Sequence, residues 1–247
     1  QLDGSKPTAA GCITGTVATA DATVALATTA GDSVINASEQ SAGFSLSGVS
    51  KNLAQGTGLT VTLNGKTYTA EVGANGAWSV NVPAADAKAL TDGTWTVAVS
   101  GKDAAGNTVS GNQTLNVDTH APTLSVNAIA QDNIINAAEH GQALTLSGTT
   151  NAEAGQIVTV TLNGKNYTAT VGNDGTWSLN LNASDVKALA EGDHTLTVNV
   201  SDKAGNPASV DHNLAVDITA PSVTIDTVAG DDVINIAEHG QAQIISG

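Results

Sequence analysis

The sequence repeats itself every 99 to 100 residues, and this repeat restricts the possible folds more than any other feature of the chain. Residues 32–39 recur at 132–139 and again at 231–238. One period has the length of one ordinary domain, so we expect tandem copies of a single domain. The repeat predicts four segments: an N-terminal segment at 1–21, interpreted as the tail of a preceding repeat, repeat 1 at 22–120, repeat 2 at 121–219, and the truncated start of repeat 3 at 220–247.

Within each repeat, apolar and polar residues alternate in short runs. Val158, Val160 and Leu162 fall on one face of such a run, and Thr159 and Thr161 fall on the other. This period of two indicates a half-buried strand, and Asn-Gly and Ala-Gly-Asn supply turns between the runs. There are about seven such runs in a repeat and no long helical periodicity, which is typical of an immunoglobulin-like sandwich rather than one large barrel. The sequence therefore predicts an all-β fold of tandem immunoglobulin-like β-sandwich domains, arranged as an extended rod.

Two further features refine this prediction. Residues 182–189, and their counterpart 83–90, have the pattern of a capped turn or two of helix that crosses between the sheets. Trp78 and Trp177 each follow a glycine turn and begin an alternating strand, so each is expected to be the large anchor of its core.

The charge and cysteine content exclude several classes of function. There are 23 acidic residues against 8 lysines, and the resulting net charge of -15 repels the phosphates of nucleic acid and of anionic lipid. No apolar run approaches the roughly 20 residues of a membrane helix. Cys12 is the single cysteine, so stability must come from burial, repetition or bound ions. We expect neither nucleic acid binding nor membrane insertion.

Catalysis has no candidate residues in this sequence. The five histidines lack the spacing of a zinc site and have no serine or cysteine partner in a nucleophile motif. No acid–base pair stands apart from the repeating pattern. We therefore expect no enzymatic activity.

Acidic residues recur at the predicted loop ends of every repeat. Alternating strand directions place the loop of Asp132 at the same end as Asp217, and the turn at 202–206 at the opposite end, where the chain enters from the preceding domain. Acids of consecutive domains are thus expected to converge at each junction. Across the first junction this set is Asp32, Glu39, Asp118, Asp202 and Asn206.

Such a set of residues predicts a metal. Several carboxylates in one crevice repel one another strongly unless a cation lies among them. Oxygen ligands without His or Cys suit Ca²⁺, so the sequence predicts a calcium clamp at each junction. The alternative is that the acids are solvated and only shape turns, since no EF-hand loop is present. The clamp extends to the equivalent positions Asp103, Asp132, Glu139, Asp217 and Asp231.

The repeated motifs also resemble a known family. Asp-x-x-Ile-Asn-x-x-Glu near the start of a repeat, Asp-x-Ala-Gly-Asn near its end and then Val-Asp-x-x-x-Pro resemble the tandem bacterial Ig-like domains of giant, type I-secreted adhesins and biofilm-associated proteins. The resemblance covers residues 22–247. It implies calcium ligands at Asp32, Asp103, Asp118, Asp132, Asp202, Asp217 and Asp231.

The resemblance implies an extracellular stalk, on a bacterial cell surface or secreted, that supports cell adhesion or biofilm formation. Its partners would be the neighbouring Ig-like repeats of the same chain, while other parts of the parent protein contact a host cell or biofilm matrix. Two alternatives stay open: a module that binds a glycan or a protein through its loops, and a passive spacer without metal. The N-terminal segment departs from the pattern, so the site of Asp103 is expected to be incomplete unless Asp3 completes it. The third repeat is truncated, so the site of Asp217 is expected to be incomplete as well.

Overall fold

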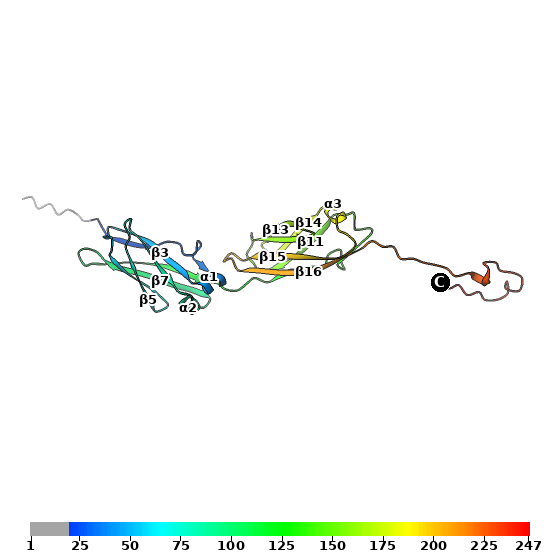
Figure 1. Ribbon diagram of the computed structural model, residues 1–247, viewed down its shortest axis with the longest axis horizontal. Helices are drawn as coiled ribbons and strands as arrows, with labels where there is room; N and C mark the ends of the chain where they lie inside the picture. Colours follow the sequence, from blue (N-terminus) through cyan, green and yellow to red (C-terminus); the bar gives the residue numbers. More distant parts are fainter. Residues whose placement is uncertain (1–19) are drawn as a thin grey trace, which may run out of the picture. The chain divides into compact units, whose positions relative to one another are not determined.

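The structure is a computed structural model that describes residues 20–247 (Figure 1). The expectations for Cys12, for Asp3 and for most of the segment 1–21 lie outside these residues. The chain divides into two compact units, one ending at His120 and the other beginning at Ala121. Each unit is described by itself.

Unit 1 is a sandwich of two sheets. Neighbouring strands run antiparallel except at one edge of the larger sheet, where two strands pair in parallel. The smaller sheet has the order β1-β3-β6 and the larger sheet has the order β2-β8-β7-β4-β5. The strands are β1 (Thr23–Leu26), β2 (Val34–Ile35), β3 (Phe44–Lys51), β4 (Gly58–Leu63), β5 (Lys66–Glu71), β6 (Ala77–Val82), β7 (Gly93–Lys102) and β8 (Thr108–Val117), and the helices are α1 (Ala37–Ala42) and α2 (Ala84–Ala87).

Unit 2 repeats this architecture strand for strand. Its sheets have the orders β9-β11-β14 and β10-β16-β15-β12-β13. The elements are β9 (Leu124–Val126), β10 (Ile134–Asn136), β11 (Leu144–Thr150), β12 (Ile157–Leu162), β13 (Lys165–Thr170), β14 (Thr176–Leu181), α3 (Ala183–Lys187), β15 (Gly192–Ser201) and β16 (Pro207–Asp217).

Local sequence explains the strands and their turns. Along β12 the residues Val158, Val160 and Leu162 are buried, which confirms the predicted alternation. The hairpin between β4 and β5 turns at Asn64 and Gly65, whose φ angles are 50° and 71°. Positive φ at both positions is what a two-residue hairpin of this kind requires, and Asn-Gly tolerates it best.

Each unit has its own hydrophobic core between its two sheets. Trp78 and Trp177 are buried anchors of these cores, as the sequence predicts. Each indole lies against a glycine of the neighbouring strand, Gly48 in unit 1 and Gly148 in unit 2. The large ring is accommodated because the strand opposite it carries no side chain at that point.

The helices follow their capping residues. The predicted crossover helix is present as α3, where the Asn182 side chain accepts a hydrogen bond from the amide of Asp185. Its counterpart α2 follows Pro83. The structure adds a helix that we did not predict, α1, which has a capping box formed by Asn36 and Glu39.

The strand count differs slightly from the expected seven, since each unit has eight strands. The additional strands are β2 and β10, of two and three residues, which pair in parallel with the last strand of their unit. Runs this short have no detectable alternation, so their assignment depends on the tertiary hydrogen bonds alone.

Residues 218–247 follow β16 and contain no strand in the structure. They include one short 3-10 turn, Val228–Gly230. Several of their large apolar side chains are exposed, among them Ile225 and Ile245. This segment therefore has no core of its own.

Candidate metal site

Two carboxylates and an imidazole meet where the chain leaves unit 1. Asp92 directly precedes β7 and Asp118 directly follows β8. Because these strands are antiparallel neighbours with Gly93 opposite Val117, the start of one lies beside the end of the other. Asp92, Asp118 and His120 each offer a ligand atom within 4.8 Å of the others. We call these three residues the exit cluster.

Hydrogen bonds tie the exit cluster to the chain that leaves the domain. The Asp92 carboxylate accepts from the Thr119 hydroxyl at 2.7 Å and from the Thr119 amide at 3.1 Å, and it contacts Nδ1 of His120. Partial burial raises the pKa of Asp92, but the hydrogen bonds from Thr119 and His120 outweigh it, so this pKa lies below its ordinary value. Asp92 is therefore held as a carboxylate near the exit of the chain.

Unit 2 carries an equivalent pair of acids. Glu191 occupies the place of Asp92, and its carboxylate accepts from the Thr219 hydroxyl at 2.6 Å and from the Ile218 amide at 3.3 Å. Asp217 accepts from the Thr219 amide at 3.2 Å, as Asp118 does from the His120 amide. The pair of acids thus recurs, whereas the imidazole of His120 is replaced by a threonine hydroxyl.

The predicted ligands Asp32 and Glu39 lie at the same end of unit 1. Parallel pairing of β2 with β8 brings this segment to the end of the last strand, where the Asp118 amide donates to the Ile35 carbonyl at 3.0 Å. The Asp32 carboxylate accepts from the Val34 amide at 2.9 Å, and the Glu39 carboxylate accepts from the Asn36 amide at 3.0 Å. Both acids therefore shape the local backbone, and their role as ligands stays a prediction.

The same local bonds recur in the later copies. Asp132 and Asp231 each accept from the amide two residues ahead, at 2.9 and 3.0 Å. Glu139 accepts from the Asn136 amide at 3.1 Å, and Asn136 is the register partner of Asp217. The acids of the β10 end thus gather around the end of β16, as strand direction requires.

The Asp-x-Ala-Gly-Asn turns lie at the opposite end of each unit. Asp103 is in the turn that joins β7 to β8, so the whole of β8 separates it from Asp118. Hydrogen bonds from the side chain and amide of Asn107 lower the pKa of Asp103. Within a unit, the structure therefore keeps the predicted ligands in two separate groups.

The turn in unit 2 differs from its twin in burial. Asp202 is 7% exposed and Asn206 is 2% exposed. The Asp202 carboxylate accepts from the Asn206 amide at 2.7 Å and from its Nδ2 at 3.0 Å, and no lysine among residues 20–247 forms an ion pair with it. Amide donors of its own turn therefore satisfy this buried carboxylate, and its role as a metal ligand stays a prediction.

Sequence reasoning missed Asp92, Glu191 and His120 as candidate ligands. Asp92 stands far from the Val-Asp motif in the sequence and belongs to no repeated motif that we used. The register of β7 against β8 alone brings it to Asp118. The one signal in the sequence was that the equivalent position of repeat 2, Glu191, is acidic as well.

The donors present fit calcium. Carboxylate and amide oxygens dominate both groups, and Ca²⁺ takes six to eight such ligands from carboxylates, amides, carbonyls and water. The imidazole of His120 is the exception, since nitrogen ligands suit transition metals better. Glu191 and Asp217, which have no histidine beside them in the chain, form the more purely oxygen-based pair.

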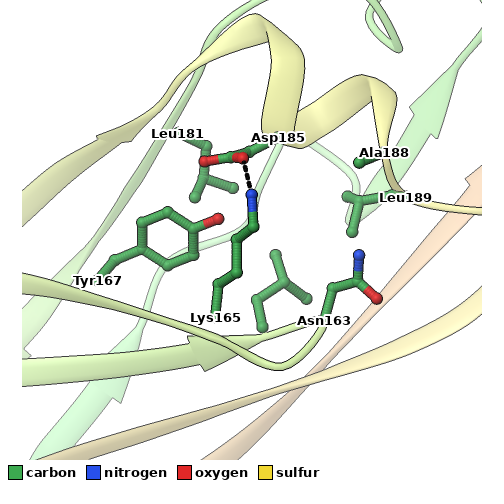
Figure 2. A pocket seen from close by; sticks show the side chains of 8 residues that line it. Asn163, Lys165, Tyr167, Leu181, Asp185, Ala188 and Leu189 are labelled. Atoms are coloured by element: carbon green, nitrogen blue, oxygen red, sulfur yellow. Dashed lines mark hydrogen bonds and ion pairs between the residues drawn. The ribbon is translucent and has the colours of Figure 1, made fainter.

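A small hollow in unit 2 has a structural explanation. Leu181 and Leu189 are among the residues that line it (Figure 2), and Lys165 Nζ lies 2.5 Å from an Asp185 carboxylate oxygen. Tyr167 also donates to Asp185, and the Lys165 contact lowers the pKa of that carboxyl. These contacts tie α3 to the β12–β13 hairpin, so we assign the hollow no ligand.

Comparison with known proteins identifies the family. Residues 16–119 and 125–227 each match the bacterial Ig-like domain family. These two matches cover most of the chain, so the protein belongs to this family of domains. No curated protein sequence matches the chain.

Two solved structures show which proteins the chain is similar to. One is described as a Ca²⁺-stabilized adhesin that helps an Antarctic bacterium reach out and bind ice; it is 37% identical over 87% of this chain and 54% of its own, with a TM-score of 0.52. The other is a 1.5-MDa bacterial ice-binding adhesin, 33% identical over 87% of this chain and 71% of its own, with a TM-score of 0.51. The chain thus resembles Ig-like regions of large bacterial adhesins.

Proposed function

We propose that this chain is a segment of the extracellular stalk of a large bacterial adhesin, with domain junctions stiffened by calcium. The tandem Ig-like domains and their similarity to two large adhesins support the stalk. The observation that carries the calcium is the exit cluster, in which ligand atoms of three side chains lie within 4.8 Å of one another. We expect no catalytic activity from these domains.

The proposed ligands lie at two places in each domain, where the chain leaves the domain and where it enters. At the exit, Asp118 and Asp217 are joined by Asp92 and Glu191, which hydrogen bond to the outgoing chain. At the entry, the Asp-x-Ala-Gly-Asn turns present a carboxylate and an amide on one short loop. To Asp92 and Glu191 the proposed set adds the ten ligands predicted from the sequence: Asp32, Glu39, Asp103, Asp118, Asp132, Glu139, Asp202, Asn206, Asp217 and Asp231.

The mechanism is electrostatic. Each Ca²⁺ offsets the repulsion between carboxylates and fixes the segment that joins two domains, so a chain of domains becomes an extended rod. A domain of this size adds roughly 30 to 40 Å to the reach of the chain. Extracellular calcium modules bind at about 10⁻⁴ to 10⁻³ M, so the sites would fill outside the cell and stay largely empty in the cytosol.

The stalk assignment extends to the flanking segments and partners. We interpret residues 220–247 as the start of a third repeat, because they carry the motif of residues 32–39 and 132–139. The immediate partners are neighbouring Ig-like domains, and contact with a host cell or biofilm matrix belongs to other parts of the parent protein. Among residues 20–247, no helix has the length and apolar character needed to cross a membrane.

Small-angle X-ray scattering of the whole chain tests the function. The profile is recorded in millimolar calcium and then with excess chelator. We expect a longer maximum dimension and less flexibility with calcium. An unchanged profile would remove calcium from the mechanism and leave a passive spacer.

Calorimetry with a matched pair of variants tests the site. Asp118→Asn removes one charge from the exit cluster, whereas Asp211→Asn removes the same charge from the exposed face of β16, where Asp211 accepts from Thr197. Calcium affinity should fall at least about 10-fold in the first variant and stay unchanged in the second. Equal affinity in both variants would contradict the proposed site.

A further inference from the structure

His120 distinguishes the exit of unit 1 from the exit of unit 2. Asp118 and Asp217 occupy equivalent positions, and two residues later the chain has His120 in unit 1 and Thr219 in unit 2. The two exits therefore share their acids, and unit 1 has in addition a ring nitrogen that can bind a metal.

A threonine hydroxyl, and not the imidazole, is what the two exits share. In unit 2 the Thr219 hydroxyl donates to Glu191 at 2.6 Å, and in unit 1 the Thr119 hydroxyl donates to Asp92 at 2.7 Å. A hydroxyl thus holds the acid against the outgoing chain in both units. The imidazole of His120 is an additional group, whose Nδ1 contacts the same Asp92 carboxylate.

The fold of unit 1 brings one nitrogen ligand and two oxygen ligands together. The register of β7 against β8 places Asp92 beside Asp118, and the His120 amide donates to the Asp118 carboxylate at 3.2 Å. The ligand atoms of the three side chains lie within 4.8 Å of one another. Zn²⁺ is bound by histidine nitrogen and carboxylate oxygen, each at about 2.0–2.2 Å, and often has three protein ligands and one water. Ca²⁺, by contrast, takes oxygen ligands.

We propose that the exit cluster of unit 1 binds a divalent transition metal, represented by Zn²⁺, more tightly than it binds Ca²⁺. Its protein ligands are Nδ1 of His120 and one carboxylate oxygen each from Asp92 and Asp118, and water completes the coordination. This inference rests on the proposed function in treating the cluster as a metal site, but it concerns a different ion. The exit of unit 2, where Glu191 and Asp217 offer oxygens alone, prefers calcium.

Calorimetric titration of the whole chain with Zn²⁺ and, separately, with Ca²⁺ tests this preference. His120→Thr gives unit 1 the residue that unit 2 has at this position. Zinc affinity should fall at least about 10-fold in this variant because the nitrogen ligand is lost, while calcium affinity should change less than about 3-fold. His239→Thr, which removes an exposed histidine from the segment after unit 2, should leave both affinities unchanged.

The reverse substitution tests whether an imidazole at this position creates a zinc site. Ile218→Thr together with Thr219→His gives unit 2 the Asp-Thr-His sequence of unit 1. The titration should then show one more equivalent of bound zinc than in the parent chain. Nitrogen-15 NMR of the histidine side chains identifies the ligand atom, and zinc should shift the Nδ1 resonance of His120 in the parent chain.

Three outcomes would overturn the inference. Equal loss of zinc and calcium affinity in His120→Thr would make this histidine a structural residue of the exit. Unchanged zinc affinity in the same variant would place the zinc elsewhere. A parent chain that binds calcium as tightly as zinc would contradict the preference. None of these results depends on the scattering profile, so failure of the calcium-stiffened stalk would leave the zinc site standing.

Discussion

Gly148 faces Trp177 across β11 and β14, and a Cβ at Gly148 would lie 2.8 Å from the indole and 1.9 Å from the Ser125 carbonyl oxygen. No side chain fits in this space without moving the backbone. We expect Gly148→Ala to lower the free energy of unfolding of unit 2 by about 1–3 kcal/mol, as overpacked cores do. This free energy is measured by urea denaturation that is monitored through hydrogen exchange of unit 2 amides.

Gly141→Ala is the matched control for that substitution. A Cβ at Gly141 meets nothing within 4 Å, and its φ is not in the left-handed region. The stability of unit 2 should therefore hardly change. If both variants unfold at the same urea concentration, the close approach of Gly148 to Trp177 is not what restricts this position.

The capping box of α1 gives a second prediction. The Asn36 side chain accepts from the Glu39 amide at 3.0 Å while the Glu39 carboxylate accepts from the Asn36 amide. Asn36→Ala removes the first bond and should cost about 1 kcal/mol of stability in unit 1. Ser38→Ala, at an exposed position of the same helix, should cost nothing in the same urea titration. Equal losses in the two variants would rule out the cap as the cause.

Tyr68 makes unit 1 sensitive to alkaline pH. Burial, with a hydrogen bond to Asp86 and the charge of that carboxylate, raises the pKa of Tyr68 to about 12. The folded state binds this proton more tightly than the unfolded state, whose tyrosine has a pKa of about 10. The stabilisation is therefore complete below pH about 10 and is lost as the pH rises through 12.

Comparison with Tyr68→Phe isolates this effect. The variant should lose stability less steeply between pH 9 and 12 than the parent chain, since lysine deprotonation affects both alike. The free energy of unfolding measured at intervals across this range provides the test. Parallel curves for the two proteins would show that Tyr68 does not titrate as described.

The Asp103 turn predicts an effect at acidic pH. Hydrogen bonds from Asn107 lower the pKa of Asp103, so its stabilising contribution is present above the unfolded pKa of about 3.9 and is lost as the pH falls through the folded value. Asn107→Ala should raise this pKa toward its ordinary value in an NMR titration. Asn112→Ala, on the exposed face of β8, should leave it unchanged.

Residue pattern predicted much of the fold because the decisive signals are local. Alternation marked β12, and the Gly-x-Trp sequences marked Trp78 and Trp177 as core anchors. The site was less accessible, since its geometry depends on contacts distant in sequence. The Val-Asp motif identified Asp118, but Asp92 reaches it only through the register of β7 and β8. Asn36 and Glu39 also have the Asn-x-x-Glu pattern of a helix cap, and this local signal would have predicted α1.

The parallel pairing of β2 with β8 determines how a domain carries tension. The chain enters unit 1 through β1 and β2 and leaves it through β8, and β2 and β8 run in the same direction as neighbours. A pull on the two ends of the domain therefore draws these strands past each other along their length. Their hydrogen bonds are then loaded together instead of opening one after another, so in a stalk of the proposed kind we expect this pairing to oppose extension of the domain.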